Sequence, residues 1–192
     1  MKAVFLDCNG VISEERPDYI KNPDEFIFLP GSIDAIKLIN ALGLPVIIVS
    51  NQSGVARGRI SMRNLKAIHA KMISSIVSEG GAITKTYYCI HYPDCEYRKP
   101  RIGMLMKASK DLGIGLSDSF FIGDKTSDMK AANAAGCTAI LVTTGHGTEQ
   151  RQSAEHLADF IDTDILAAAR RIAAMSPAQS SNVTSSKDCI VV

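Results

Sequence analysis

The sequence lacks tryptophan, and only 6% of its residues are aromatic. It also lacks an excess of either charge, because 21 lysine and arginine residues face 20 aspartate and glutamate residues, giving a formal net charge of +1. A near-neutral chain without a basic, aromatic stripe is untypical of nucleic-acid-binding proteins and has no general attraction to an anionic membrane surface. No apolar run approaches the roughly 18 residues that a membrane span needs. We therefore expect neither nucleic acid nor a membrane as a partner.

A targeting sequence and an even set of cysteines are also missing. The first apolar segment begins within three residues of Met1, which leaves no room for a signal peptide. Five cysteines, an odd number, in such a chain favour a reducing compartment. We expect a cytoplasmic monomer without structural disulfides, and a length of 192 residues is typical of a single domain.

Short apolar segments alternate with helical patterns along most of the chain. Strands are predicted at residues 3–6, 45–49, 86–90, 119–122 and 138–142, and helices at 32–42, 61–79, 102–112, 129–135 and 164–175. This alternation predicts an α/β fold of three layers, in which helices cover both faces of a parallel sheet. Polar residues make 13–25 a predicted loop or flap and 145–147 a predicted loop, and 155–160 is a last short segment.

The composition changes near the end of the chain. Residues 1–175 form the predicted domain, whereas residues 176–192 are rich in serine, threonine and glutamine and are predicted to be a disordered tail. The last four residues, Cys-Ile-Val-Val, resemble a prenylation box only superficially, because no basic run precedes them.

Polar side chains follow four of the predicted strands. Asp7 follows the first, Ser50 ends the second, Lys99 lies in the loop after the third, and Asp124 and Asp128 follow the fourth. A single aspartate after a strand is most often a turn cap. Four such loops in order indicate a site instead, because ligands of open parallel sheets bind beyond the carboxyl ends of the strands.

The chemistry of these residues is coherent. Asp7 and Asp124 offer carboxylate oxygens, which are the ligands that Mg²⁺ prefers. The Lys99 ammonium and the Ser50 hydroxyl can hold phosphate oxygens, and a carboxylate beside a metal ion can attack phosphorus to form an aspartyl-phosphate. The pattern therefore predicts phosphoryl transfer.

Three longer motifs carry a family resemblance that covers about residues 2–147. They are Val49 to Gly58 (VSNQSGVARG), Tyr88 to Pro100 (YC-x-H-x-P, then C-x-x-RKP) and Ile122 to Ala132 (IGDKTSDM-x-AA). With Asp7 they resemble the haloacid dehalogenase (HAD) superfamily of phosphohydrolases. More narrowly, the sequence is similar to its branch of D-glycero-D-manno-heptose-1,7-bisphosphate 7-phosphatases and histidinol-phosphatases. The resemblance implies a HAD-like Rossmannoid fold, and the short loops imply a minimal cap.

The resemblance also implies a role for each matching residue. Asp7 would be the nucleophile and would bind Mg²⁺ together with the backbone carbonyl of Asn9 and with Asp124. Ser50 and Lys99 would stabilise the transferring phosphoryl group, and Asp128 would orient Lys99 or the metal shell. Contacts to a small phosphorylated sugar would come from Glu15, Arg16, Asn51, Gln52, Ser53, Arg57, Arg98 and Lys125.

Asn9 departs from the family pattern D-x-D-G-T, in which the second aspartate is the general acid and base. An amide cannot do this work, and general acid–base catalysis typically supplies about 10²- to 10⁴-fold in rate. Three hypotheses follow: a working, slower sugar-phosphate phosphatase; a phosphosugar-binding or regulatory protein with negligible turnover; or a phosphotransferase that keeps Asp7 phosphorylated. Histidinol phosphate is an alternative substrate to the heptose bisphosphate.

A second departure concerns zinc. Many relatives hold a structural Zn²⁺ through C-x-H…C-x-C, and Cys89, His91 and Cys95 match three of these ligands, but Tyr97 stands at the fourth position. Structural zinc is almost always four-coordinate. The loop is therefore predicted either to bind Zn²⁺ with a further ligand such as water or Asp94, or to carry reduced thiols.

Overall fold

The computed structural model describes residues 1–175 and 190–191, which alternate between strands and helices as the sequence predicted. The strands are β1 (Val4–Leu6), β2 (Val46–Asn51), β3 (Lys85–Cys89), β4 (Phe120–Gly123), β5 (Thr138–Val142), β6 (Phe160–Asp162) and β7 (Ile190–Val191). The α-helices are α1 (Ser32–Ala41), α2 (Met62–Ser78), α3 (Gly103–Leu112), α4 (Thr126–Ala135), α5 (Gly147–Ala154) and α6 (Ile165–Met175). Short 3₁₀ turns lie at η1 (Pro23–Glu25), η2 (Leu116–Asp118) and η3 (Glu155–Leu157).

The strands form one parallel sheet in the order β6-β5-β4-β1-β2-β3-β7. β1 lies at the centre, with Phe5 beside Ile47 of β2 on one side and beside Phe121 of β4 on the other. The chain leaves β1 in one direction and returns to its other side only at β4. This reversal opens a crevice at the carboxyl ends of the central strands, where ligands of such sheets bind.

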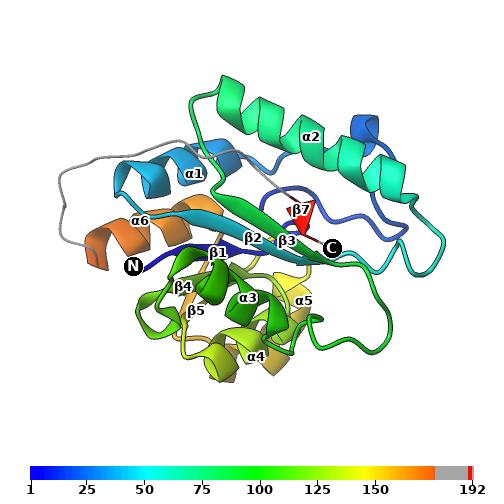
Figure 1. Cartoon of the computed structure of the whole chain (residues 1–192). Helices are drawn as coiled ribbons and strands as arrows, with labels where there is room; N and C mark the ends of the chain where they lie inside the picture. Colours follow the sequence, from blue (N-terminus) through cyan, green and yellow to red (C-terminus); the bar gives the residue numbers. More distant parts are fainter. Residues whose placement is uncertain (176–189, 192) are drawn as a thin grey trace.

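Helices cover both faces of the sheet (Figure 1). Alternation along β1 sends Val4 and Leu6 to the face covered by α1, α2 and α6, and sends Phe5 to the face covered by α3 and α4. Both faces of the central strands are buried, so β1 and the first four residues of β2 are apolar at every position, as is typical of parallel sheets. The predicted three-layer α/β fold is confirmed.

Two stretches differ from the sequence-based expectation. No helix was predicted directly after β5, because residues 147–154 are too polar to give a clear apolar stripe. The structure nevertheless forms helix α5 there, beginning at Gly147. Ile190–Val191 was predicted to lie in a disordered tail, but it pairs with β3 as β7, since β3 otherwise presents an unpaired sheet edge. The rest of the predicted tail, including the first and last residues of the prenylation-like ending, lies outside the described residues.

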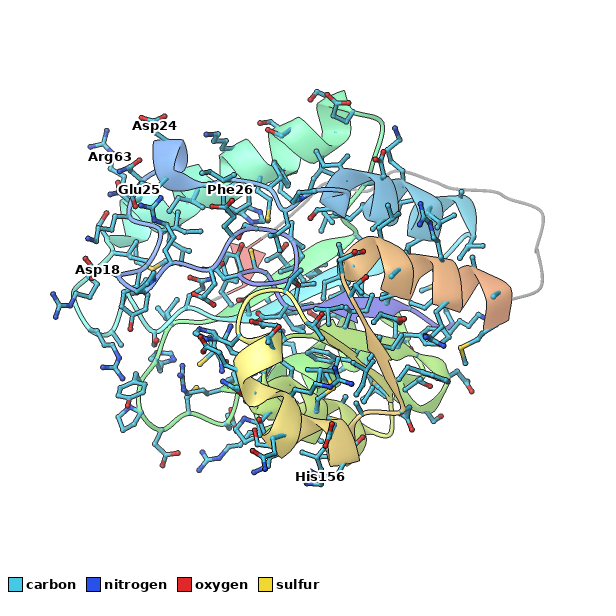
Figure 2. The ribbon with its side chains drawn as sticks, turned by 180° about the vertical axis from the view of Figure 1, so that it is seen from behind. Asp18, Asp24, Glu25, Phe26, Arg63 and His156 are labelled. Atoms are coloured by element: carbon cyan, nitrogen blue, oxygen red, sulfur yellow. The ribbon has the colours of Figure 1, made fainter. Side chains whose placement is uncertain are left out.

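The flap, residues 13–29, runs across the carboxyl edge of the sheet and is fastened to α2. The Lys71 ammonium donates to the Pro23 carbonyl at 2.6 Å, and the Asn64 amide donates to the Lys21 carbonyl at 2.8 Å. Figure 2 labels Asp24 and Glu25 of η1 at this junction. Within the described residues no helix is both long and apolar enough to cross a membrane.

Ser119 joins β4 to β1 through a buried hydroxyl. It accepts from the Ala3 amide at 3.0 Å and donates to the Gly115 carbonyl at 2.6 Å. We expect Ser119→Ala to lower the free energy of unfolding by about 1–3 kcal/mol, because it leaves a buried amide without a partner. Urea denaturation measures this loss. The exposed Ser74 on α2 provides a control, since Ser74→Ala should cost less than about 0.5 kcal/mol; equal losses at the two serines would contradict the prediction.

Candidate active site

A cavity of about 360 Å³ opens at the carboxyl edge of the sheet. It gathers most of the site residues predicted from the sequence, although they come from every part of the first 150 residues. Its lining comprises Asp7, Asn9, Glu15, Arg16, Pro17, Tyr19, Ser50, Asn51, Gln52, Ser53, Arg98, Lys99, Lys125, Ser127, Asp128 and His146. Asp124 lies buried beneath this lining.

Lys99 is the buried centre of the site. Its ammonium nitrogen lies 3.0 Å from Asp7 Oδ1, 2.7 Å from Asp128 Oδ1 and 2.8 Å from the carbonyl oxygen of Val49. Only 3% of the Lys99 surface and 4% of the Asp7 surface are exposed. The predicted nucleophile is therefore held against a cation in a water-poor environment, where their electrostatic interaction is strong.

Asn51 fixes the loop that carries Lys99. Its side-chain oxygen accepts from the Lys99 amide at 3.0 Å, and its amide group donates to the Lys99 carbonyl at 3.1 Å. The resemblance implied that Asn51 contacts substrate, but the structure shows that its amide also holds a backbone segment in place.

Asp128, at the start of α4, has two partners, one for each carboxylate oxygen. Its Oδ2 atom accepts from the Lys125 amide at 3.1 Å, a contact that caps the helix, while Oδ1 pairs with Lys99. Helix α4 therefore begins at Thr126, three residues before the predicted start at Met129.

Asp124 is fully buried under the loop after β5. Its Oδ2 atom accepts from the His146 amide at 2.9 Å. Gly10 and Gly145 allow this close approach, because a Cβ atom on either would lie 2.1 Å and 2.4 Å, respectively, from Asp124 Oδ2, and both backbones have positive φ. His146 and Gly145 were not predicted as site residues. Only the Gly-His-Gly spacing after β5 could have signalled them.

Besides the Glu15 carboxylate, three oxygen atoms converge on the ammonium group of Lys125. The Nζ atom lies 3.2 Å from Asp124 Oδ1, 3.3 Å from the Asn9 carbonyl oxygen and 3.7 Å from Asp7 Oδ2. These are the same atoms or residues that the resemblance assigns to a metal ion. A set of oxygen atoms that surrounds an ammonium group is also suited to a hard divalent cation, which prefers oxygen ligands. Oxygens of Asp7, Asp124 and Asp128 also lie within 4.8 Å of one another.

The pKa values of the charged groups reflect their mutual contacts. Burial would raise the pKa of Asp7, but the nearby Lys99 and Lys125 ammonium groups reverse the effect and hold it below the ordinary value. Burial, reinforced by the Asp7 and Asp128 charges and opposed by Lys125, raises the pKa of Asp124 to about 7. Burial would lower the pKa of Lys99, but the Asp128 and Asp7 carboxylates raise it, so Lys99 stays charged. Asp7 is thus ionised at neutral pH, as a nucleophile must be.

The arginines are arranged differently from one another. Arg98 lines the cavity, and its buried Nη1 atom has no hydrogen-bond partner within the described residues. Arg57 lies outside the lining and stacks on Tyr92 at 3.7 Å from the ring centroid, while Arg98 lies 5.0 Å from the same ring. The structure therefore does not bring Arg57 into the cavity with the other predicted substrate contacts.

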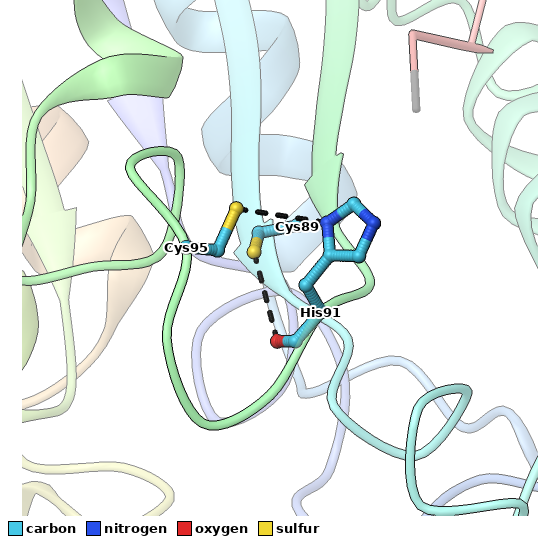
Figure 3. A group of neighbouring side chains, drawn as sticks. All are labelled: Cys89, His91 and Cys95. Carbon is cyan, nitrogen blue, oxygen red and sulfur yellow. Dashed lines mark hydrogen bonds between the residues drawn. The ribbon is translucent and has the colours of Figure 1, made fainter.

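The cysteine loop after β3 brings its three predicted ligands together (Figure 3). The donor atoms of Cys89, His91 and Cys95 lie within 4.8 Å of one another, with Cys95 Sγ 3.6 Å from His91 Nδ1. Asp94, a candidate fourth ligand, pairs instead with Arg101 at 2.6 Å.

We expect divalent-cation binding to depend on pH through Asp124. Since the pKa of Asp124 is raised to about 7, this group carries a proton at about pH 6, and a cation must displace it. The apparent affinity for Mg²⁺ should therefore fall as pH falls below about 7, by up to tenfold per pH unit for one linked proton. Calorimetric titration in buffers of different ionisation enthalpy measures the released proton.

Asp124→Asn provides the matched control, because it cannot release this proton at any pH. Proton release by the natural protein that is the same at about pH 6 and about pH 8.5 would contradict the assignment to Asp124.

Comparisons with known proteins point to the same family as the sequence motifs. The HAD-hydrolase-like family model matches residues 96–168. The D-glycero-beta-D-manno-heptose-1,7-bisphosphate 7-phosphatase of Pseudomonas putida is 37% identical over 90% of this chain and 99% of its own length. The Pseudomonas aeruginosa enzyme of the same name is 41% identical over 75% of this chain and 82% of its own length.

A solved structure shows the same fold. The D,D-heptose 1,7-bisphosphate phosphatase from B. bronchiseptica, complexed with magnesium and phosphate, superimposes with a TM-score of 0.86 at 34% identity, covering 91% of this chain and 99% of the other. Identity of this extent over nearly the whole length of both chains confirms the predicted family: the chain belongs to the HAD superfamily of phosphatases.

Proposed function

We propose that this protein is a Mg²⁺-dependent phosphatase that releases the 7-phosphate of D-glycero-D-manno-heptose 1,7-bisphosphate through a phosphorylated Asp7. The observation that carries the proposal is the ionised Asp7 carboxylate, which Lys99 contacts at 3.0 Å beside a set of oxygens suited to a divalent cation. Three relatives named for this activity are 37–41% identical to the chain, which supports the choice of substrate.

The residues divide the work by position. Asp7, the Asn9 carbonyl and Asp124 would hold Mg²⁺, which when bound neutralises charge on the phosphate oxygens. The Lys99 ammonium and the Ser50 hydroxyl donate to the same phosphoryl group and stabilise its charge in the transition state. A carboxylate oxygen of Asp7 then attacks phosphorus, and the sugar oxygen leaves.

Other residues of the cavity lining suit the rest of an anionic sugar. Arg98 and Arg16 line it, and the unpaired Nη1 atom of Arg98 is a buried donor that a phosphate or sugar oxygen would satisfy. Gln52 and Ser53 add neutral hydrogen-bonding groups for sugar hydroxyls. The short flap in place of a cap domain leaves specificity to these loops.

Asn9 is the reason for two alternatives to the phosphatase function. Its backbone carbonyl faces the cation position, so binding survives, whereas its amide cannot protonate the leaving oxygen. One alternative is a phosphosugar-binding or regulatory protein with negligible turnover, and another is a phosphotransferase that retains phospho-Asp7. Histidinol phosphate is the alternative substrate.

We expect the natural protein to release phosphate from the heptose bisphosphate, and Asn9→Asp to raise turnover by about 10- to 10³-fold, because a carboxyl group two residues from Asp7 supplies an acid and a base. Phosphate release over a panel that includes histidinol phosphate measures this. Asp7→Asn is the inactive control, and Asn9→Ala keeps the backbone ligand without gaining an acid.

Each alternative has its own outcome. A natural protein that releases no phosphate while Asn9→Asp is active would replace the proposal with the regulatory reading. Phospho-Asp7 that accumulates without release would favour phosphotransfer, and faster release from histidinol phosphate would change the substrate.

We also propose that Cys89, His91 and Cys95 hold one Zn²⁺ whose fourth position is open to solvent. The three donor atoms support this, although burial raises the pKa of the Cys89 thiol, so a metal must displace its proton. Elemental analysis of protein purified without chelators or affinity-tag metals should find about one zinc per chain, lost in Cys95→Ser. Metal-free protein with two titratable thiols, at Cys89 and Cys95, would favour reduced cysteines instead.

We also propose that the protein works in a reducing compartment. The described cysteines Cys8, Cys89, Cys95 and Cys137 are all free, which supports a reducing compartment such as the cytoplasm.

A further inference from the structure

A phosphatase of this kind needs a group that gives a proton to the leaving oxygen and later takes one from water. Among the described residues that line the cavity, the side chains with a carboxylate or an imidazole, the commonest general acids and bases, are Asp7, Glu15, Asp128 and His146. Asp7 is the proposed nucleophile. Asp128 has no exposed surface and pairs with Lys99. Glu15 and His146 therefore remain.

We propose that Glu15 performs the acid–base chemistry that Asn9 cannot, an inference that rests on the proposed phosphatase function. Glu15 Oε2 lies 2.8 Å from the Lys125 ammonium nitrogen, which in turn lies 3.7 Å from Asp7 Oδ2 and 3.3 Å from the Asn9 carbonyl oxygen. One ammonium group thus bridges Glu15 and the nucleophile. The Glu15 side chain is 22% exposed, so water reaches it from the cavity.

The backbone holds Glu15 close to the first strand end. Gly10 donates to the Ser13 carbonyl at 2.7 Å, and Ser13 forms isolated bridges with Asn9 and with Phe28. Glu14 then donates to the Ile27 carbonyl at 2.9 Å. The turn that follows Asp7 therefore returns to the cavity, where it presents Glu15 from the fastened flap.

Two groups face the Glu15 carboxylate. Lys125 contacts it from α4, and His146 Nε2 lies 3.8 Å away in the loop after β5. The His146 amide donates to Asp124, and the Nδ1 atom of its ring lies 3.2 Å from Glu149 Oε2, so both the backbone and the ring have a contact that places His146 beside Glu15. We regard His146 as a positioning residue and Glu15 as the group that touches the reacting atoms.

The proton balance closes over one cycle. As Asp7 attacks phosphorus and the bond from phosphorus to the sugar oxygen breaks, the carboxyl group of Glu15 gives its proton to that oxygen. Water then attacks the phosphorus of the aspartyl-phosphate and passes a proton to the Glu15 carboxylate, while the bond between phosphorus and Asp7 breaks. Inorganic phosphate leaves, Asp7 is a carboxylate again, and Glu15 is protonated for the next cycle.

The test is Glu15→Gln in two backgrounds. In the natural background we expect a loss of about 10²-fold in turnover, and in the Asn9→Asp background a loss of only a few-fold, because the new aspartate supplies the same proton. Glu14→Gln is the matched control, since Glu14 is the exposed neighbour on the same flap. The turnover of the Glu14→Gln variant should equal that of the natural protein. Equal losses from Glu15→Gln in both backgrounds would mean a structural role and would overturn the proposal.

A second readout separates the two chemical steps. With p-nitrophenyl phosphate the leaving group is acidic enough to depart unaided, so Glu15→Gln should keep the initial burst of nitrophenol and accumulate phospho-Asp7, detected by mass spectrometry. A burst that slows together with turnover would overturn the acid–base role.

Failure of the proposed function has a different signature. If neither the natural protein nor Asn9→Asp releases phosphate from the heptose bisphosphate, the substrate proposal fails, while the aryl phosphate experiment still decides the role of Glu15. A natural protein that forms no phospho-Asp7 and releases no nitrophenol would overturn both.

Discussion

The buried ammonium group of Lys99 is the contact on which the rest of the site depends. It ties Asp7 after β1 to Asp128 in α4 and to the backbone of β2 through the Val49 carbonyl. Breaking a buried ion pair from one side costs about 3–5 kcal/mol, because the remaining charge is left unpaired in a poor solvent. The four strand ends are therefore held in one arrangement by charge, and Asn51 adds two hydrogen bonds that lock the Lys99 backbone.

The charge balance of the site also explains why it favours a divalent cation. Asp7, Asp124, Asp128 and Glu15 bring four carboxylates, whereas Lys99 and Lys125 bring two ammonium groups. Carboxylates are therefore in excess around these two ammonium groups. Burial raises the pKa of Asp124, and the charges of Asp7 and Asp128 add to this effect while Lys125 opposes it. A divalent cation would remove this excess, and Lys125 would then be free to turn from the oxygen set toward a phosphate.

The sequence predicted the sheet, its order of elements and the edge at which the site lies, because these follow from apolar segments that end in polar turns. Asp7, Ser50, Lys99 and Asp128 share the cavity as expected, and Asp124 lies directly beneath it. Only its place between two glycines could have pointed to His146, because its contact to Asp124 runs through a backbone amide that any residue possesses. Arg57 was predicted to bind substrate because of the motif in which it lies. In the structure its guanidinium group stacks on the ring of Tyr92, which lies in a loop distant in sequence. Such long-range contacts leave no periodic signal in the chain.

The first strand end shows how binding and turnover can be separated within one turn. In the proposed site, Asn9 contributes to the cation position through its backbone carbonyl, which an asparagine in place of an aspartate leaves untouched. The proton transfer, in contrast, depends on a side chain, and a side chain with the right chemistry can come from any element that reaches the cavity. Glu15 reaches it six residues later in the same turn, on a flap fastened to α2 by Lys71 and Asn64. A backbone ligand survives any substitution at its position, whereas an acid–base role depends on the side chain. The asparagine at position 9 therefore removes the acid and base but keeps the proposed metal and phosphate geometry, so another carboxylate that reaches the cavity can take over the proton transfer.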